Sequence, residues 1–171
     1  RSSAASDVYK RQITGWRLGY VIANPEIIDR VKKVHDFLTV GAAAPLMEAA
    51  TVGLKFDDKY YDELAAHYAH MKEVFVGGLE KLGLKYTDPQ GAYYVLVDVS
   101  EFGVKDDVKF CEWMAQFVGV AAVPGSSFFR EDVHNLVRFH FAKQDDTLNE
   151  AIKRLATLKE KAMNAKNVDW R

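Results

Sequence analysis

The sequence predicts an α/β segment followed by an α+β domain, and three observations carry this prediction. A short apolar run at residues 18–23 leads directly into a helix start at Asn24 and Pro25. A long helix with one apolar face follows from Asp57 or Asp58 and ends at Gly83. Beyond it, stretches rich in β-branched and aromatic residues alternate with shorter helical patterns. This order is typical of an α/β segment joined to an α+β unit.

Composition limits the classes of function. The chain has 171 residues, of which 49% are hydrophobic and 27% charged, with a formal net charge of −1. These values are typical of a soluble globular protein and give no basis for nucleic acid or an acidic membrane as a partner. Cys111 is the single cysteine, which excludes an internal disulfide framework and a thiolate metal cluster. No apolar run is long enough to span a bilayer.

The first part of the chain contains one predicted strand and two predicted helices. Residues 18–23 are expected to form a buried strand. Asn24, Pro25 and Glu26 combine a capping side chain, a first-position proline and an early acid, so a helix should begin there. Its apolar stripe runs to Leu38, and Pro45 begins a second helix that reaches about residue 52.

The longest helix and two strands come next. From Asp57 or Asp58, apolar side chains recur every three or four residues, and Gly83 stands where a C-terminal glycine belongs. Residues 85–87 and 92–99 are predicted strands, separated by a turn at residues 88–91.

Further elements complete the prediction. A helix should begin at Asp106 or Asp107, and residues 120–123 should form a strand that Pro124 stops. Residues 135–141 are a predicted strand, Asp145 or Asp146 should begin the last helix, and residues 164–171 are expected to fray. The inward side chains of the helix after Asp107 are expected to be Val108, Cys111 (or Glu112), Ala115 and Val118.

The predicted organisation has three parts. Residues 1–12 are polar, lack periodicity and resemble translated sequencing-adapter read-through, with a disordered tail as the alternative. Residues 13–56 and 57–171 form two further parts. One strand alone cannot make a sheet, and its unpaired edges would be a liability. We therefore expect the chain to be a piece of a larger protein.

Two arginines are the candidate binding residues. Arg17 lies in residues 14–20 (Thr-Gly-Trp-Arg-Leu-Gly-Tyr), directly before the predicted strand. Arg138 lies in residues 136–143, on the strand face opposite Val137 and Phe139. A guanidinium forms bidentate bonds with phosphate or carboxylate, so two of them predict a ligand with two anionic groups. The alternatives are a salt bridge for Arg17 and an ion pair with Asp98 or Glu131 for Arg138.

Together these two stretches resemble the C-terminal part of class I aminotransferases, which use pyridoxal phosphate. Three more stretches resemble the family in the expected order, and His35 begins one that is similar to kynurenine- and methionine-type members. The three stretches are residues 35–40, 89–94 and 123–129, and the resemblance extends from Ile13 to about Lys161.

The resemblance implies roles for individual residues. Arg17 would bind the cofactor phosphate and Arg138 the α-carboxylate of the substrate. The family's Schiff-base lysine should stand at position 9, where this sequence has Tyr9. Lys10 is one residue out of register, so no catalytic role is assigned to it. The chain alone is therefore expected to be inactive.

The resemblance also implies the fold and the activity. The chain would comprise the end of the large pyridoxal-phosphate-binding domain and the small C-terminal domain of a fold-type-I enzyme. The intact enzyme would be a cytoplasmic homodimer that moves an amino group between an amino acid and a 2-oxo acid. Residues 35–40 would approach the partner subunit's active site, and Phe37 hints at an apolar or aromatic substrate side chain. Two alternatives stay open: a carbon–sulfur lyase of the same fold, and a stand-alone, non-catalytic carboxylate-binding domain.

The remaining histidines and the cysteine are expected to be structural. His67 and His70 lie three residues apart on the long helix without a third metal ligand nearby, so surface positions are expected. His134 should lie in a loop. His140 shares the face of Arg138 and could line a pocket or only pack. Cys111 is expected to be a small buried hydrophobic residue.

Overall fold

The computed structural model describes residues 14–171, and these form two compact units. The described part of the first unit is residues 14–62 and the second unit is Glu63–Arg171, so the division falls inside α4 (Asp58–Lys81). The predictions for Tyr9, Lys10 and the rest of residues 1–12 lie outside the described residues. No helix within residues 14–171 combines the length and the apolar character needed to cross a membrane.

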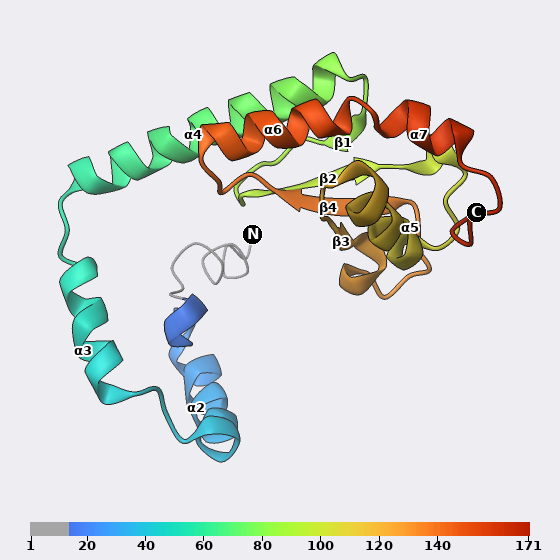
Figure 1. The fold of residues 1–171 in the computed structure, drawn as a ribbon. Coiled ribbons are helices and arrows are strands. Elements are labelled where there is room, and N and C mark those ends of the chain that lie inside the picture. The colour runs from blue at the N-terminus through green and yellow to red at the C-terminus, as the bar shows by residue number, and fades with distance from the viewer. Residues whose placement is uncertain (1–13) are drawn as a thin grey trace. The chain divides into compact units, whose positions relative to one another are not determined.

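The first unit consists of helices and extended connections. The short 3-10 helix η1 (Thr14–Trp16) is followed by α2 (Pro25–Thr39) and α3 (Ala44–Gly53) (Figure 1). The Asn24 side chain caps α2 by accepting a hydrogen bond of 3.1 Å from the backbone N–H of Glu26, as predicted. Neither α2 nor α3 contains a buried residue.

The predicted strand at residues 18–23 is wrong. Only Leu18 takes part in an isolated bridge, and residues 19–24 have no regular secondary structure. A strand is stabilised by a neighbour that pairs along its length. Within residues 14–171 no segment pairs along this stretch, so its apolar composition is not sufficient to make it a strand.

The second unit is built around a four-stranded antiparallel sheet with the order β1-β2-β4-β3. Three strands lie within a residue or two of the predicted ranges. The fourth prediction, residues 120–123, is wrong in its position, because the strand comprises only Val123 and Pro124. Pro124 pairs with Val137 at the edge of the sheet, where a residue without an N–H is tolerated. The strands are β1 (Lys85–Thr87), β2 (Tyr94–Asp98), β3 (Val123–Pro124) and β4 (Leu136–His140).

Helices cover one face of this sheet. The part of α4 within the second unit runs beside α6 (Asp145–Leu155), as Figure 1 shows. Gly78 lies so close to Ile152 that an added Cβ atom would come within 2.5 Å of it. Phe75 of α4 packs on Phe139 of β4 with ring centroids 5.8 Å apart. Because side chains alternate along β2 and β4, the residues between the buried ones face away from this core.

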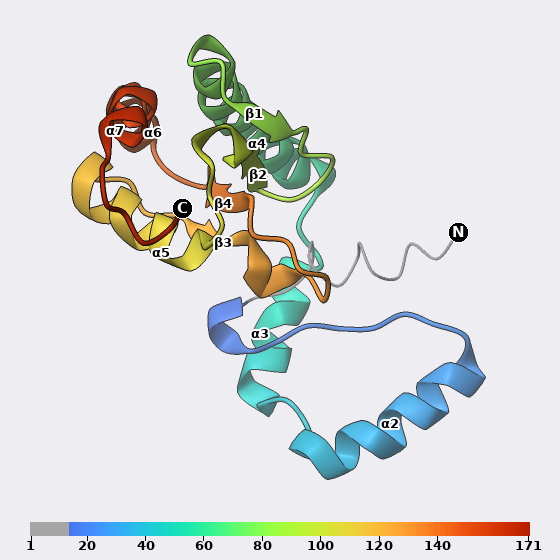
Figure 2. The same ribbon diagram turned by 90° about the vertical axis from the view of Figure 1, so that its right-hand side faces the viewer.

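The segment between β2 and β3 packs through different residues than expected. It contains η2 (Ser100–Phe102), α5 (Asp107–Trp113) and the π-helical turn η3 (Met114–Val118), and α5 contacts β3 and β4 (Figure 2). Cys111 and Val118 are buried as predicted, but Val108 is 45% exposed and Glu112 and Ala115 are also exposed. A π-turn is wider than an α-turn. Burial therefore follows a spacing of four residues, through Phe110, Met114 and Val118.

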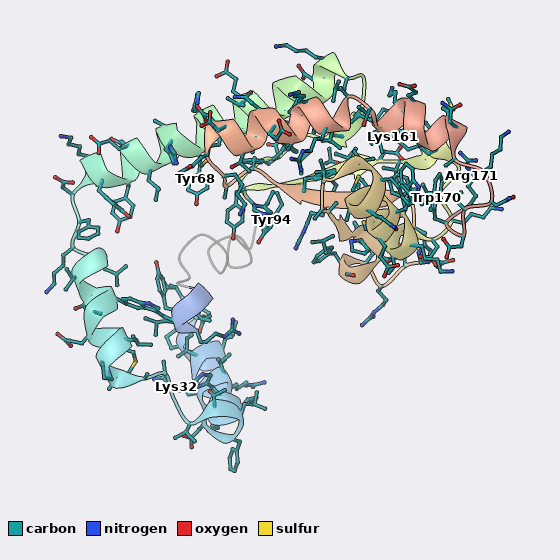
Figure 3. The ribbon with its side chains drawn as sticks, viewed as in Figure 1. Lys32, Tyr68, Tyr94, Lys161, Trp170 and Arg171 are labelled. Carbon is teal, nitrogen blue, oxygen red and sulfur yellow. The ribbon has the colours of Figure 1, made fainter. Side chains whose placement is uncertain are left out.

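The C-terminal residues are ordered, so the prediction that residues 164–171 fray is wrong. After α7 (Leu158–Asn164), the Trp170 ring is fully buried, 5.1 Å from the Phe110 ring and 5.4 Å from the Trp113 ring. The Arg171 guanidinium, labelled with Trp170 in Figure 3, donates to the carbonyl oxygens of Phe102, Ala162 and Ala165. A large aromatic residue near the terminus thus anchors it to the core.

Candidate functional site

Arg138 lies between two aromatic rings on the sheet face that points away from α4 and α6. Its guanidinium carbon is 4.2 Å from the centroid of the Tyr94 ring and 3.6 Å from that of the Phe128 ring. Tyr94 comes from β2, and Phe128 ends the short 3-10 helix η4 (Gly125–Phe128) that follows β3. A cation stacked on an aromatic face is stabilised by the ring quadrupole.

No carboxylate of the described chain neutralises Arg138. Asp98, one expected partner, instead accepts hydrogen bonds from the Ser100 backbone N–H (2.9 Å) and from the Asn135 side chain (3.1 Å). Glu131, the other expected partner, forms no ion pair with Arg138. The two rings lie against the guanidinium carbon, and a guanidinium carries its five N–H donors in the plane of the ion. This cation can therefore receive an external anion at its edge.

Tyrosines extend the aromatic surface from Arg138 toward α4. The Tyr94 hydroxyl donates a hydrogen bond of 3.1 Å to the Tyr93 hydroxyl, and the Tyr93 ring stacks on the Tyr68 ring at 5.9 Å. Tyr68 and Tyr94 are labelled in Figure 3. The hydrogen bond with Tyr94 and partial burial raise the pKa of Tyr93. The Tyr93 phenol therefore stays neutral near pH 7, and the three tyrosines supply hydrogen-bonding and stacking groups.

His140 shares the outer sheet face with Arg138, as the alternation of β4 predicted. It pairs with Tyr94 in the register of the sheet, and its side chain is exposed. Desolvation of the ring by its neighbours and the positive charges of Lys143 and Arg138 lower its pKa. A neutral imidazole beside Arg138 adds a hydrogen-bonding group without adding charge.

Arg17 belongs to the first unit and is exposed. Its φ angle is 56°, a left-handed conformation that non-glycine residues rarely adopt. The predicted alternative, a salt bridge to an acid of the same unit, is not found among residues 14–171. Such backbone conformations are more frequent at binding sites, where the surrounding structure maintains them.

Sequence reasoning missed the aromatic partners of Arg138 as site residues. Tyr94 and Phe128 lie in two of the stretches that resemble the aminotransferases, so these stretches were the available signal. Their contact with Arg138 depends on the β2–β4 register, which pairs Leu96 with Arg138, and on the fold of η4. Asp107 was also missed, because in the sequence it is indistinguishable from a helix-capping residue.

The other candidates have structural roles. His70 forms an ion pair of 2.9 Å with Asp145 on the surface, and His67 is exposed. Within residues 14–171, no group of His, Cys, Asp and Glu side chains is arranged to hold a metal ion. Cys111 is buried, and desolvation raises the pKa of its thiol to about 12. The thiol is therefore protonated and inert in the folded unit.

Comparison with known proteins is consistent with this geometry. Residues 11–155 match the family of class I and II aminotransferases. Methionine aminotransferase of Escherichia coli strain K12 is 36% identical over 147 residues, and kynurenine–oxoglutarate transaminase 3 of Bos taurus is 31% identical over 160 residues. The match with the bacterial enzyme covers 85% of this chain and 38% of the relative, and the match with the bovine enzyme covers 81% and 35%.

A solved structure gives the same result in three dimensions. N-succinyldiaminopimelate aminotransferase of Mycobacterium tuberculosis superimposes with a TM-score of 0.75 and 33% sequence identity, over 85% of this chain and 38% of that one. This superposition confirms the predicted fold class. The chain spans about two-fifths of the length of these relatives, and it belongs to the class I and II aminotransferases.

Proposed function

We propose that Arg138 binds the carboxylate of an amino-acid or 2-oxo-acid substrate, in an enzyme that moves an amino group between the two with pyridoxal phosphate. The observation that carries this proposal is the stacked guanidinium of Arg138, which has no acidic partner among residues 14–171. The named relatives act as aminotransferases on methionine, kynurenine or N-succinyldiaminopimelate, so the transfer of an amino group is favoured over elimination.

The stacking defines how a carboxylate would approach. With the Tyr94 and Phe128 rings against its carbon atom, we expect the guanidinium to bind a planar anion at its edge, through two parallel N–H···O bonds. Bidentate binding fixes the orientation of the carboxylate as well as its position. Fixed orientation of the reacting bond is a large part of what a protein contributes to such a reaction.

Arg17 fits the phosphate of the cofactor. Its guanidinium is exposed and carries no ion pair within the described chain, so its donors can bind phosphate oxygens. Pyridoxal phosphate, when bound, would supply the electron sink and carry the amino group. The lysine that the family uses is expected at position 9, where the sequence has Tyr9. We therefore assign no proton-transfer step to this chain and expect it to be inactive alone.

The proposal extends to assembly, organisation and location. Residues 13–56 would be the end of the large domain and residues 57–171 the small domain of a cytoplasmic homodimer. Residues 35–40 would approach the partner subunit's active site, which is consistent with the exposure of Phe37 (93%) and Leu38 (75%) in the first unit. The named methionine and kynurenine enzymes favour an apolar or aromatic substrate side chain.

The test is a titration of the 171-residue chain with L-methionine, in which binding is measured from the backbone amide NMR signals of β2 and β4, because these signals remain observable when Arg138 is replaced. We expect Arg138→Gln to weaken binding about ten- to a hundredfold, because a hydrogen-bonded charged contact is worth roughly 1.5–3 kcal/mol. Arg130→Gln is the matched control, since Arg130 is an exposed arginine of the segment between η4 and β4. Equal affinities of Arg138→Gln and the unaltered chain would refute the carboxylate site.

A further inference from the structure

Asp107 is the one buried charged side chain in the part of the chain that the structure describes, and it is completely inaccessible to solvent. Removing a carboxylate from water is costly unless it is paired and hydrogen-bonded. Here Oδ2 accepts a hydrogen bond of 2.8 Å from the backbone N–H of Ser126, and Oδ1 accepts one of 2.9 Å from Nδ1 of His134. Burial opposes ionisation, but these bonds outweigh it and lower the pKa of Asp107, so the carboxylate is ionised near pH 7.

The two oxygens of Asp107 hold the two ends of one segment. Ser126 lies near the start of η4, and His134 lies two residues before β4 begins at Leu136. The segment between them contains Phe128, whose ring covers Arg138. Asp107 itself is the first residue of α5, so a third element anchors both ends.

The start of η4 is also pressed against the strand that carries Arg138. A Cβ atom added to Gly125 would lie 2.5 Å from the carbonyl oxygen of Leu136. The turn therefore has little freedom to move toward β4, and the bond from Ser126 to Asp107 opposes movement away from it. Phe128, two residues after Ser126, is placed by these two constraints together.

We propose that Asp107 is a positioning residue of the Arg138 site. It acts through η4: its carboxylate fixes Ser126, η4 then presents the Phe128 ring, and that ring sets the plane of the Arg138 guanidinium. The placement of Phe128 is independent of what Arg138 binds. Its consequence for carboxylate affinity rests on the proposed function.

Asp132 offers a matched control for this role. Its carboxylate accepts from Nε2 of His134 at 2.8 Å, but its side chain is 94% exposed and it makes no bond to η4. Asp107→Asn and Asp132→Asn both remove one negative charge next to His134. Only the first weakens the attachment of Ser126.

The experiment follows the Nε–Hε signal of Arg138 in the full 171-residue chain with labelled arginine. Stacking between two rings displaces this proton signal upfield, and Phe128→Leu serves as the reference that removes the effect of the Phe128 ring. Phe128→Leu measures how much of the upfield shift of the Arg138 signal is caused by the Phe128 ring. We expect Asp107→Asn to lose most of that part of the shift. Asp132→Asn should keep it. An Arg138 signal that is unchanged in Asp107→Asn, while it responds to Phe128→Leu, would overturn the proposal.

A second variant covers the case in which Asp107→Asn does not fold. Ser126→Pro removes the N–H donor and leaves Asp107 in place, and a fixed φ is accommodated at the second position of such a turn. It should shift the Arg138 signal as Asp107→Asn would, and an unchanged signal would again overturn the proposal. Adding L-methionine to each variant separates the two hypotheses. If the Arg138 signal changes in Asp107→Asn but does not respond to L-methionine, the carboxylate site is refuted and the positioning role of Asp107 is supported.

Discussion

The Phe128 ring lies 3.6 Å from the guanidinium carbon of Arg138, although the two residues belong to different elements and the ring is 46% exposed. Arg138 is fixed by the pairing of β4 with its neighbours, whereas Phe128 depends on a four-residue turn. The strand β4 thus carries the charged guanidinium, and the turn η4 carries one of the two rings that contact it. The orientation of the guanidinium is sensitive to both.

Replacing Phe128 with leucine should weaken carboxylate binding without unfolding the second unit. A cation–π contact is worth about 0.5–2 kcal/mol, which corresponds to roughly two- to thirtyfold in affinity. Titration with L-methionine measures the change. Phe129→Leu is the control, because Phe129 is the extended residue that directly follows η4 and is 38% exposed. Equal losses in the two variants would show that the stacked ring has no specific role.

Replacing Gly78 with alanine should destabilise the second unit by about 1–3 kcal/mol, the usual cost of overpacking a close contact. Three carbon atoms of Ile152 would lie within 3.0 Å of the new methyl group, so α4 and α6 must separate. Gly77→Ala is the control on the same helix, since nothing lies within 4 Å of its added Cβ. That variant should be stabilising by up to about 1 kcal/mol through helix propensity.

Urea unfolding followed by circular dichroism distinguishes the two glycines. Adding Ile152→Ala to Gly78→Ala provides a further check, because the smaller side chain makes room for the methyl group. The double variant should be more stable than the sum of the two single effects. Strict additivity would mean that Gly78 and Ile152 are not in contact.

Replacing Trp170 with alanine should destabilise the second unit by about 3–5 kcal/mol, because the whole ring is buried against Phe110 and Trp113. Trp170→Phe should cost less, because the indole N–H has no hydrogen-bond partner among the described residues. Trp16→Ala is the control, since Trp16 is 43% exposed and lies in the first unit. Similar urea midpoints for Trp170→Ala and the unaltered chain would contradict the buried anchor.

Local signals in the sequence were sufficient to predict most of the helices. The Asn24 cap and Pro25 begin α2, Asp57 accepts from the backbone N–H of Tyr60 at the start of α4, and Gly83 has the left-handed φ of 63° expected after a helix. Each of these depends on neighbours within a few residues. The strand at residues 18–23 and the burial of Trp170 depend on distant partners, and both were predicted wrongly.

The candidate site shows the same division. Alternation along β4 predicted that Arg138 and His140 share one face, and the structure confirms it. The contacts of Tyr94 and Phe128 with Arg138 require the strand register and the path of η4, which no local pattern specifies. Asp106 and Asp107 show this most clearly. Asp106 caps α5 by accepting a hydrogen bond from the backbone N–H of Lys109, whereas its neighbour Asp107 is buried, and no local pattern distinguishes the two.

The His134 cluster should make stability depend on pH. Hydrogen bonds with Asp107 and Asp132 raise the pKa of His134 above its ordinary value of about 6.5. The pH-dependent contribution of His134 to the free energy of unfolding is therefore complete below about pH 6.5. It is lost as the pH rises through the folded-state pKa of His134. The pKa of Asp107 is lowered, so its contribution is complete above about pH 4 and is lost as the pH falls through the folded-state pKa. The test is urea unfolding of the unaltered chain and of His134→Gln at several pH values. The difference between their free energies of unfolding should shrink as the pH rises from 6 to above the folded-state pKa of His134. A difference that does not depend on pH would show that His134 does not become charged in the folded state.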